Sequence, residues 1–124
     1  MWRGTVGTVG SGGILRRLRT PVDEIDRAQL SEWAKAQGGI PLRELPLRVP
    51  IAAVGEVRSV RIVPRAGADA LEATISDGDG SLTAVFLGRR RIGGVAPGRR
   101  LEVRGVAMAA GNQRLMFNPI YRLF

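Results

Sequence analysis

Arginine and carboxylate side chains are the groups that could carry binding or catalytic chemistry in this sequence of 124 residues. Neither Cys nor His occurs, which excludes disulfides, thiolate or imidazole metal ligands, and His-based catalysis. The formal net charge is +8, and eighteen of the nineteen basic residues are Arg, with Lys35 the only Lys. Because guanidinium groups bind phosphate bidentately and stack on bases, this composition indicates a polyanionic partner. The mutational bias of a GC-rich genome explains Arg over Lys equally well, but it does not explain the net charge.

The arginines form two groups in the second part of the chain. Residues 49–124 hold eleven basic against six acidic residues, whereas residues 1–48 hold eight against five. The densest cluster is Arg89, Arg90 and Arg91, and the second group comprises Arg58, Arg61 and Arg65. We expect both groups to contact phosphate, with a solvated loop as the alternative for the first. The sequence leaves open whether the two groups share one face.

Asp77 and Asp79 resemble the opening of a calcium-binding loop. The sixth position of such a loop would be Leu82 rather than Gly, and the twelfth would be Gly88 rather than Glu. The two aspartates therefore favour a turn, in which they bond to their own backbone. No metal site is predicted.

The remaining acidic candidates for catalysis lie within predicted strands. Glu56, Glu72 and Glu102 alternate with apolar neighbours, which is typical of ordinary solvent-facing strand residues. General acid/base work needs two acids that converge in a cleft. We therefore predict a protein that is not an enzyme and has no cofactor.

A hairpin at residues 71–87 is the element on which the candidate site is built. Apolar and polar residues alternate on both sides of the Asp-Gly-Asp-Gly turn at 77–80, as in two half-buried strands. Phe86 falls on the inner face. The outer face shows no aromatic residue, and Val85 with Leu87 forms an apolar strip that suits a protein partner as well as a base.

Further strands are predicted on both sides of this hairpin. The first covers residues 51–63, with a bulge or kink at Gly55, and is followed by a loop at 64–69. A basic connection at 88–98 is too Gly-rich for much helix. A fourth strand at 99–107, a hairpin at 109–113 and a fifth strand at 114–123, interrupted at Asn118-Pro119, complete the pattern. Phe117 and Tyr121 are expected in the core or at the barrel closure.

The N-terminal part divides into a tail and an arm. Residues 1–13 are rich in Gly and are predicted to be a disordered tail, and residues 14–48 form a helical arm and a Pro-rich connector. The helix should begin at Pro21 and run to about Gln37, with Val22, Ile25, Trp33 and Ala36 on one face and Leu30 at its edge. Trp33 is expected to anchor the helix on the barrel. No membrane span or signal peptide is recognisable, so we expect a soluble cytoplasmic protein.

The strand order and four segments resemble an OB-fold. These segments are residues 54–60, 75–83, 95–105 and 116–121, and they are similar to strand signatures of the tRNA-anticodon-type OB-folds, most closely the wedge domain of the RecG helicase. The chain is also similar to stand-alone actinobacterial OB-fold proteins. The resemblance covers residues 49–124 and implies single-stranded or junction nucleic-acid binding on strands two and three and on the loops 1–2 and 4–5. No helicase motor is present in the sequence.

The sequence thus predicts a mainly β protein, a five-stranded OB-fold Greek-key barrel at residues 49–124 preceded by a short helical arm. Its predicted function is non-enzymatic binding of single-stranded DNA or RNA with little sequence specificity. The alternative is a protein–protein interaction module that acts as an adaptor or accessory subunit. The candidate nucleic-acid-binding residues are Arg58, Arg61, Arg65, Thr74, Thr83, Val85, Arg89, Arg90, Arg91, Asn112 and Arg114.

Overall fold

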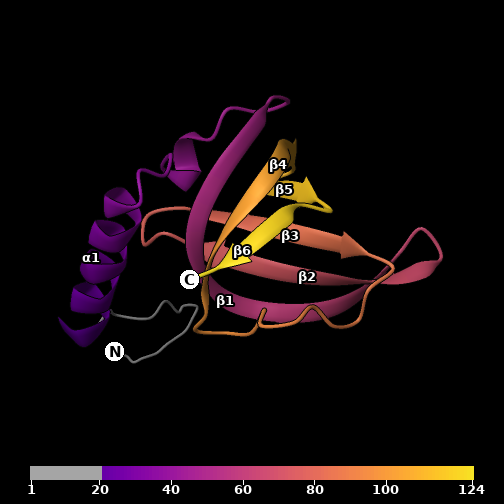
Figure 1. Cartoon of the computed structure of the whole chain (residues 1–124), viewed down its shortest axis with the longest axis horizontal. Coiled ribbons are helices and arrows are strands. Elements are labelled where there is room, and N and C mark those ends of the chain that lie inside the picture. Colours follow the sequence, from indigo (N-terminus) through magenta and orange to yellow (C-terminus); the bar gives the residue numbers. More distant parts are fainter. Residues whose placement is uncertain (1–20) are drawn as a thin grey trace.

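A computed structural model describes residues 21–124 as a closed β-barrel with one helix packed beside it (Figure 1). The predicted tail at 1–13 and the segment 14–20 lie outside the described residues. The elements are α1 (Pro21–Ala36), a 3-10 turn η1 (Leu42–Glu44), β1 (Pro50–Arg65), β2 (Ala68–Ser76), β3 (Ser81–Leu87), β4 (Arg100–Ala110), β5 (Gln113–Phe117) and β6 (Ile120–Leu123). Within the described part, no helix is long and apolar enough to cross a membrane.

The strand order is that of an OB-fold. The sheet runs β1-β2-β3-β5-β4-β6, and it closes because β1 also pairs with β4. β3 and β5 run parallel, whereas the other neighbouring strands are antiparallel. The predicted fold class is confirmed. The predicted fifth strand is two strands, β5 and β6, because Asn118 adopts a positive φ of 50° and Pro119 separates them.

β1 coils around the barrel and changes its partner halfway along. Residues 50–56 pair with β4, and residues 56–65 pair with β2. A Cβ atom on Gly55 would lie 2.9 Å from the Ser76 carbonyl oxygen, so only Gly allows this close approach. The irregularity in the β1–β2 register lies between Val57 and Ser59, three residues beyond the bulge that the sequence predicted.

The loop predicted at residues 64–69 is a two-residue hairpin turn. Arg65 pairs with Ala68, and both Ala66 and Gly67 have positive φ, 50° and 81°, as a type I′ turn requires. The strands therefore run further than predicted. Figure 1 shows the resulting β1–β2 hairpin projecting from the barrel on the side away from α1.

The barrel interior follows the predicted alternation. Leu71, Ala73, Ile75, Leu82, Ala84 and Phe86 all belong to the main buried core. Tyr121 is half-buried against this core and packs edge-to-face on Phe86, with ring centroids 5.9 Å apart, which agrees with a core position, one of the two predicted for it. The connection between β3 and β4 contains no helix, as predicted, and its Ile92 and Val95 are buried in the core.

Helix α1 docks through its C-terminal half, by a different face from the predicted one. Leu30 and Ala34 are buried, whereas Ile25 is 55% exposed and Ala36 is exposed. The Val22 side chain lies outside the described set. Trp33 stands edge-to-face against Phe124, with centroids 5.1 Å apart, and Arg100 lies over its ring. Trp33 is therefore an anchor, as predicted.

The β2–β3 turn clamps the arm to the barrel. The buried Asp77 carboxylate accepts hydrogen bonds from the backbone N–H groups of Asp79 and Gly80 through Oδ1, and from that of Leu42 through Oδ2, at 2.8 to 3.0 Å. Arg27 on α1 donates to the Gly78 carbonyl oxygen at 3.1 Å. Both Asp77 oxygens are thus occupied by backbone donors, which supports a turn rather than a calcium loop.

We predict that Asp77→Ala lowers the free energy of unfolding by about 3 kcal/mol, because charge-assisted bonds to buried N–H groups are lost. Asp79→Ala should cost about 0.5 kcal/mol at most, since the Asp79 carboxylate is exposed and its contact within residues 21–124 is a long one, 3.4 Å from the Ser31 hydroxyl. Urea unfolding measures both values. Equal losses in the two variants would contradict the clamp.

Candidate nucleic-acid interface

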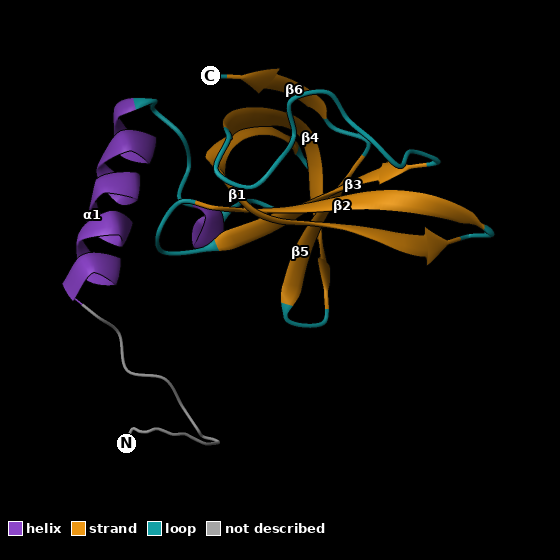
Figure 2. Cartoon of the chain, turned by 90° about the horizontal axis from the view of Figure 1, so that it is seen from below, coloured by secondary structure: helices purple, strands orange, loops and turns teal. Residues whose placement is uncertain are grey.

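The resemblance placed the site on strands two and three and on the loops 1–2 and 4–5, and in the barrel the outer face of β2 and β3 continues onto the neighbouring strands β1 and β5. The pairing register sets two rows of residues across it. Arg61, Glu72, Val85 and Phe117 form one row, and Ser59, Thr74, Thr83 and Leu115 form the next. Figure 2 shows the β1–β2 hairpin and the β4–β5 turn extending from the barrel in different directions.

Glu72 lies at the centre of this face and holds two arginines. Its Oε1 accepts from Arg61 Nη2 at 3.2 Å, and its Oε2 accepts from Arg65 Nε at 2.7 Å. The Arg61 side chain is exposed, whereas Glu72 is buried beneath the two guanidinium groups. The prediction that Glu72 is an ordinary solvent-facing residue is wrong, because arginines of the neighbouring strand cover it.

Phe117 supplies the aromatic ring that the sequence did not place on this face. It lies opposite Val85, at the border of a small apolar cluster with Ala70 and Leu115. The Arg65 guanidinium lies over the Phe117 ring, 5.6 Å from its centroid. Of the two places predicted for Phe117, the core or the barrel closure, the main barrel core does not hold it: it packs, half-buried, on this second core cluster where β5 pairs with β3. Strand alternation around the buried Met116 was the signal that places Phe117 outside.

The predicted apolar strip of Val85 and Leu87 does not exist. Val85 is fully buried under Phe117 and Leu115, because β5 lies beside β3, whereas Leu87 is 41% exposed. Val85 is thus a packing residue and is not available to a ligand, which corrects its place among the candidates. Thr74 and Thr83 do share the outer face, and their hydroxyl oxygens lie 3.1 Å apart.

Arg58 is separated from Arg61 and Arg65. It pairs with Glu56 at 3.1 Å and lines a hollow toward α1, together with Asp26, Gln29, Leu30, Glu56 and Arg100. The register irregularity next to Arg58 changes the alternation of side chains along β1. Only the last two arginines of the predicted group therefore lie on the face of Glu72.

Arg89, Arg90 and Arg91 are exposed in the connection after β3. Arg90 forms an ion pair with Asp69, at the start of β2, whereas Arg89 and Arg91 have no ion pair with any residue in 21–124. Arg90 and Arg91 border a hollow of about 350 Å³ with Val60 and Leu71, which face the core. Arg90 and Arg91 thus border the opposite face of the β1–β2 hairpin from Arg61 and Arg65, so the two predicted groups do not share one face.

Asn112 and Arg114 differ in their surroundings. Asn112 is exposed in the β4–β5 turn. Arg114 is turned toward the connector, where its Nη2 donates to the Arg43 carbonyl oxygen at 2.9 Å, and its Nε is buried without a partner among the described residues. Arg114 therefore lies apart from the face of Glu72 and Phe117.

Comparison with known proteins gives structural likenesses alone. No family model matches the sequence, and no curated protein matches it. A chain of a replication protein A heterotrimer bound to ssDNA is 17% identical, with a TM-score of 0.46. A chain of the S. pombe Stn1-Ten1 complex is 19% identical, with a TM-score of 0.49. In each case the match covers 60% of this chain and 57% of the other, so this chain spans little more than half of either.

We predict that Val85 and Leu87, the two residues of the supposed strip, differ sharply on truncation. Val85→Ala should lower the free energy of unfolding by about 2 kcal/mol, because it leaves a cavity under Phe117. Leu87→Ala should stay within about 0.5 kcal/mol. Chemical denaturation measures both, and a tolerated Val85→Ala with a costly Leu87→Ala would contradict the packing described.

Proposed function

We propose that this protein is a non-enzymatic OB-fold module that binds single-stranded nucleic acid on the outer face of β1, β2, β3 and β5. The observation that carries the proposal is that Phe117 lies beneath Arg65 on the same face as Arg61. Single-strand binders combine a stacking aromatic side chain with cations that follow the backbone, and each stacked base contributes about 1–3 kcal/mol. In OB-folds this face and the flanking loops bind oligonucleotides.

The preference for single strands rests on what the surface offers. A ring on a sheet face can stack only on a base that is free of its partner strand. α1, the one α-helix in the described part, carries Asp23, Glu24, Asp26 and Glu32, which would repel phosphate from a helix placed in a groove. Little sequence specificity follows, because phosphate contacts carry no sequence information.

The β1–β2 hairpin extends the proposal to junctions, at which two strands diverge. Arg61 and Arg65 lie on one face of this hairpin, and Arg90 and Arg91 border its other face. A projecting hairpin with cations on both faces fits between two separating strands. The resemblance of the sequence to the RecG wedge domain supports this finer proposal.

A protein partner remains a second candidate, on a different face. The strip that motivated it is absent, but Ile120 is 74% exposed beside a hollow of about 520 Å³, lined also by Glu102, Arg104, Tyr121 and Arg122. In this second candidate, Ile120 would be the apolar anchor of the partner and the surrounding charged residues its rim. A pull-down from nuclease-treated lysate distinguishes the candidates: a partner kept at high salt and lost in Ile120→Ser supports this one.

We predict that fluorescence anisotropy detects binding of labelled oligothymidylate at low salt and weaker binding of a duplex of equal length. With four arginines engaged, log K against log salt should have a slope of about −3. Absence of binding at low salt would contradict the proposed function.

The double variant Arg89→Ala/Arg91→Ala tests the loop. Neither arginine has an ion pair within residues 21–124, so the melting temperature of the double variant should equal that of the unchanged protein. If both contact phosphate, every oligonucleotide should bind more weakly by a similar factor, and the slope should flatten by about 1.4. Unchanged affinity would show that these two arginines do not contact the ligand and would support the alternative interpretation, a solvated loop.

Replacement of Phe117 by Leu tests the stacking residue. Leu preserves the contact with Val85 but removes the aromatic ring, so we expect oligothymidylate to bind about tenfold more weakly. Phe124→Leu is the matched control, because Phe124 also lies beneath an arginine, Arg122, but on the side of α1 and β6. Equal effects in the two variants would remove Phe117 from the interface.

A further inference from the structure

Three strand glutamates each hold two arginines, and one arginine of every pair also lies over an aromatic ring. The three clusters are Glu56 with Arg58 and Arg100, Glu72 with Arg61 and Arg65, and Glu102 with Arg104 and Arg122. The rings beneath Arg100, Arg65 and Arg122 are those of Trp33, Phe117 and Phe124, 4.7 to 5.6 Å from the guanidinium carbon. The same arrangement thus occurs three times on the barrel.

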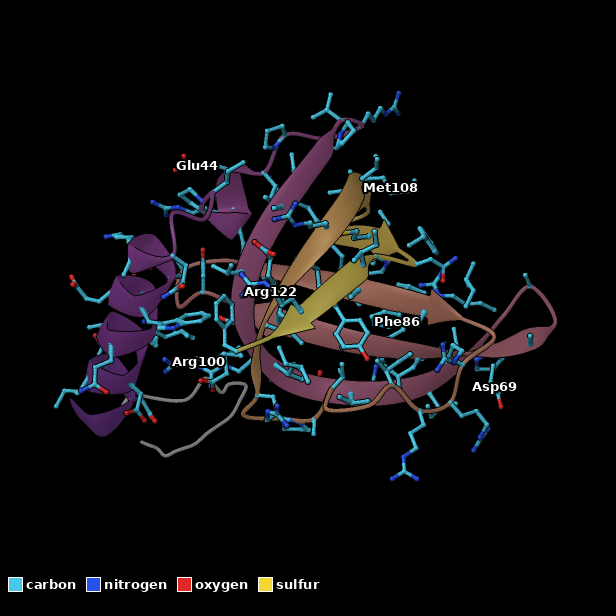
Figure 3. The ribbon with its side chains drawn as sticks, viewed as in Figure 1. Glu44, Asp69, Phe86, Arg100, Met108 and Arg122 are labelled. Carbon is cyan, nitrogen blue, oxygen red and sulfur yellow. The ribbon has the colours of Figure 1, made fainter. Side chains whose placement is uncertain are left out.

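The clusters of Glu56 and Glu102 have an evident packing role. Trp33 and Phe124 meet edge-to-face, so these two clusters join α1 to β6. Figure 3 shows Arg100 and Arg122 on the side of the barrel nearer to α1, and Asp69, at the start of β2, toward the opposite end. The Glu72 cluster forms no ion pair or ring contact with the described residues of α1, so docking of the arm does not explain it.

Glu72 is also the most deeply placed of the three carboxylates. Its side chain is 6% exposed, compared with 19% for Glu56 and 14% for Glu102, and its 2.7 Å contact with Arg65 is the shortest among the clusters. Arg65 reaches both Glu72 and the Phe117 ring. In the free protein, one carboxylate therefore engages both phosphate-binding arginines and holds one of them over the stacking ring.

We infer that Glu72 is a built-in competitor of the nucleic-acid phosphate, an inference that rests on the proposed function of this face. A bound strand exchanges the carboxylate for phosphate on Arg61, whose side chain is exposed, and a base takes the place of Arg65 over Phe117. Only a ligand that brings a phosphate and a free base together compensates for both contacts. Glu72 thereby selects single-stranded nucleic acid over inorganic phosphate and over a duplex backbone.

The test compares Glu72→Gln with Glu102→Gln in anisotropy titrations of oligothymidylate. The two variants change the net charge equally, and each removes the charge of a carboxylate that holds two arginines. Glu72→Gln should bind about three- to tenfold more tightly, as expected for removing one negative charge a few ångströms from a phosphate. Its salt slope should steepen by about 0.7, as for one more neutralised phosphate. Glu102→Gln should bind like the unchanged protein.

The outcomes separate the proposed function from the competitor role of Glu72. If the unchanged protein does not bind oligothymidylate, the proposed function fails. If it binds, and Glu72→Gln binds equally or more weakly, the competitor role of Glu72 is overturned while the proposed function stands. An equal gain in both variants would also overturn it, since net charge alone would then explain the result.

An NMR titration of the unchanged protein tests the same inference even if Glu72→Gln does not fold. The Nε–H resonance of Arg65, assigned with Arg65→Lys, should move on addition of oligothymidylate, because its partner changes from carboxylate to phosphate or solvent. The Nε–H resonance of Arg122, which faces Glu102 at 3.4 Å, should stay in place. An unmoved Arg65 resonance at saturation would overturn the inference.

Discussion

Ion pairs between strand glutamates and arginines determine how much of this protein's positive charge a ligand can reach. A carboxylate that loses most of its water on a sheet is stabilised by a nearby cation, and here each of three carboxylates has two arginines around it. Six arginines are thereby committed to glutamates. The high net charge of the sequence therefore overstates how many arginines are available to an anionic ligand. Directly available are those without an acidic partner within residues 21–124, such as Arg89 and Arg91.

Closure of the barrel gives these clusters their positions. Parallel pairing of β3 with β5 brings Phe117 beside Val85 and across the row from Glu72, although β5 is about thirty residues beyond β3 in the sequence. The long β1 crosses from β4 to β2 and places Arg61 at the end of that row. Arg65 lies four residues further along β1, and its side chain reaches back to Glu72 and Phe117. The candidate interface is thus a consequence of sheet topology, and the buried Asp77 fixes the arm at the opposite end of the β2–β3 hairpin.

Local patterns in the sequence predicted what depends on neighbours along the chain. Alternation gave the inner residues of the central hairpin, and Pro119 gave the break between β5 and β6. The errors concern contacts between strands that are distant in sequence. Val85 was predicted to be exposed because the local pattern does not show that β5 lies beside β3 and covers it. Glu72 was predicted to be solvated because the arginines that cover it belong to another strand, β1. The predicted docking face of α1 was wrong because the β2–β3 turn and Phe124, just after β6, contact only part of the helix.

The central claim is that single-stranded nucleic acid lies across the face formed by β1, β2, β3 and β5. Mapping of backbone amide shifts during titration with oligothymidylate tests it most directly. The account predicts that the largest changes cluster around Phe117 on β5, Thr74 and Thr83 on the central hairpin, and Arg65 at the end of β1. Changes confined to the β4–β6 face around Ile120, or saturation of binding without changes around Phe117, would contradict it.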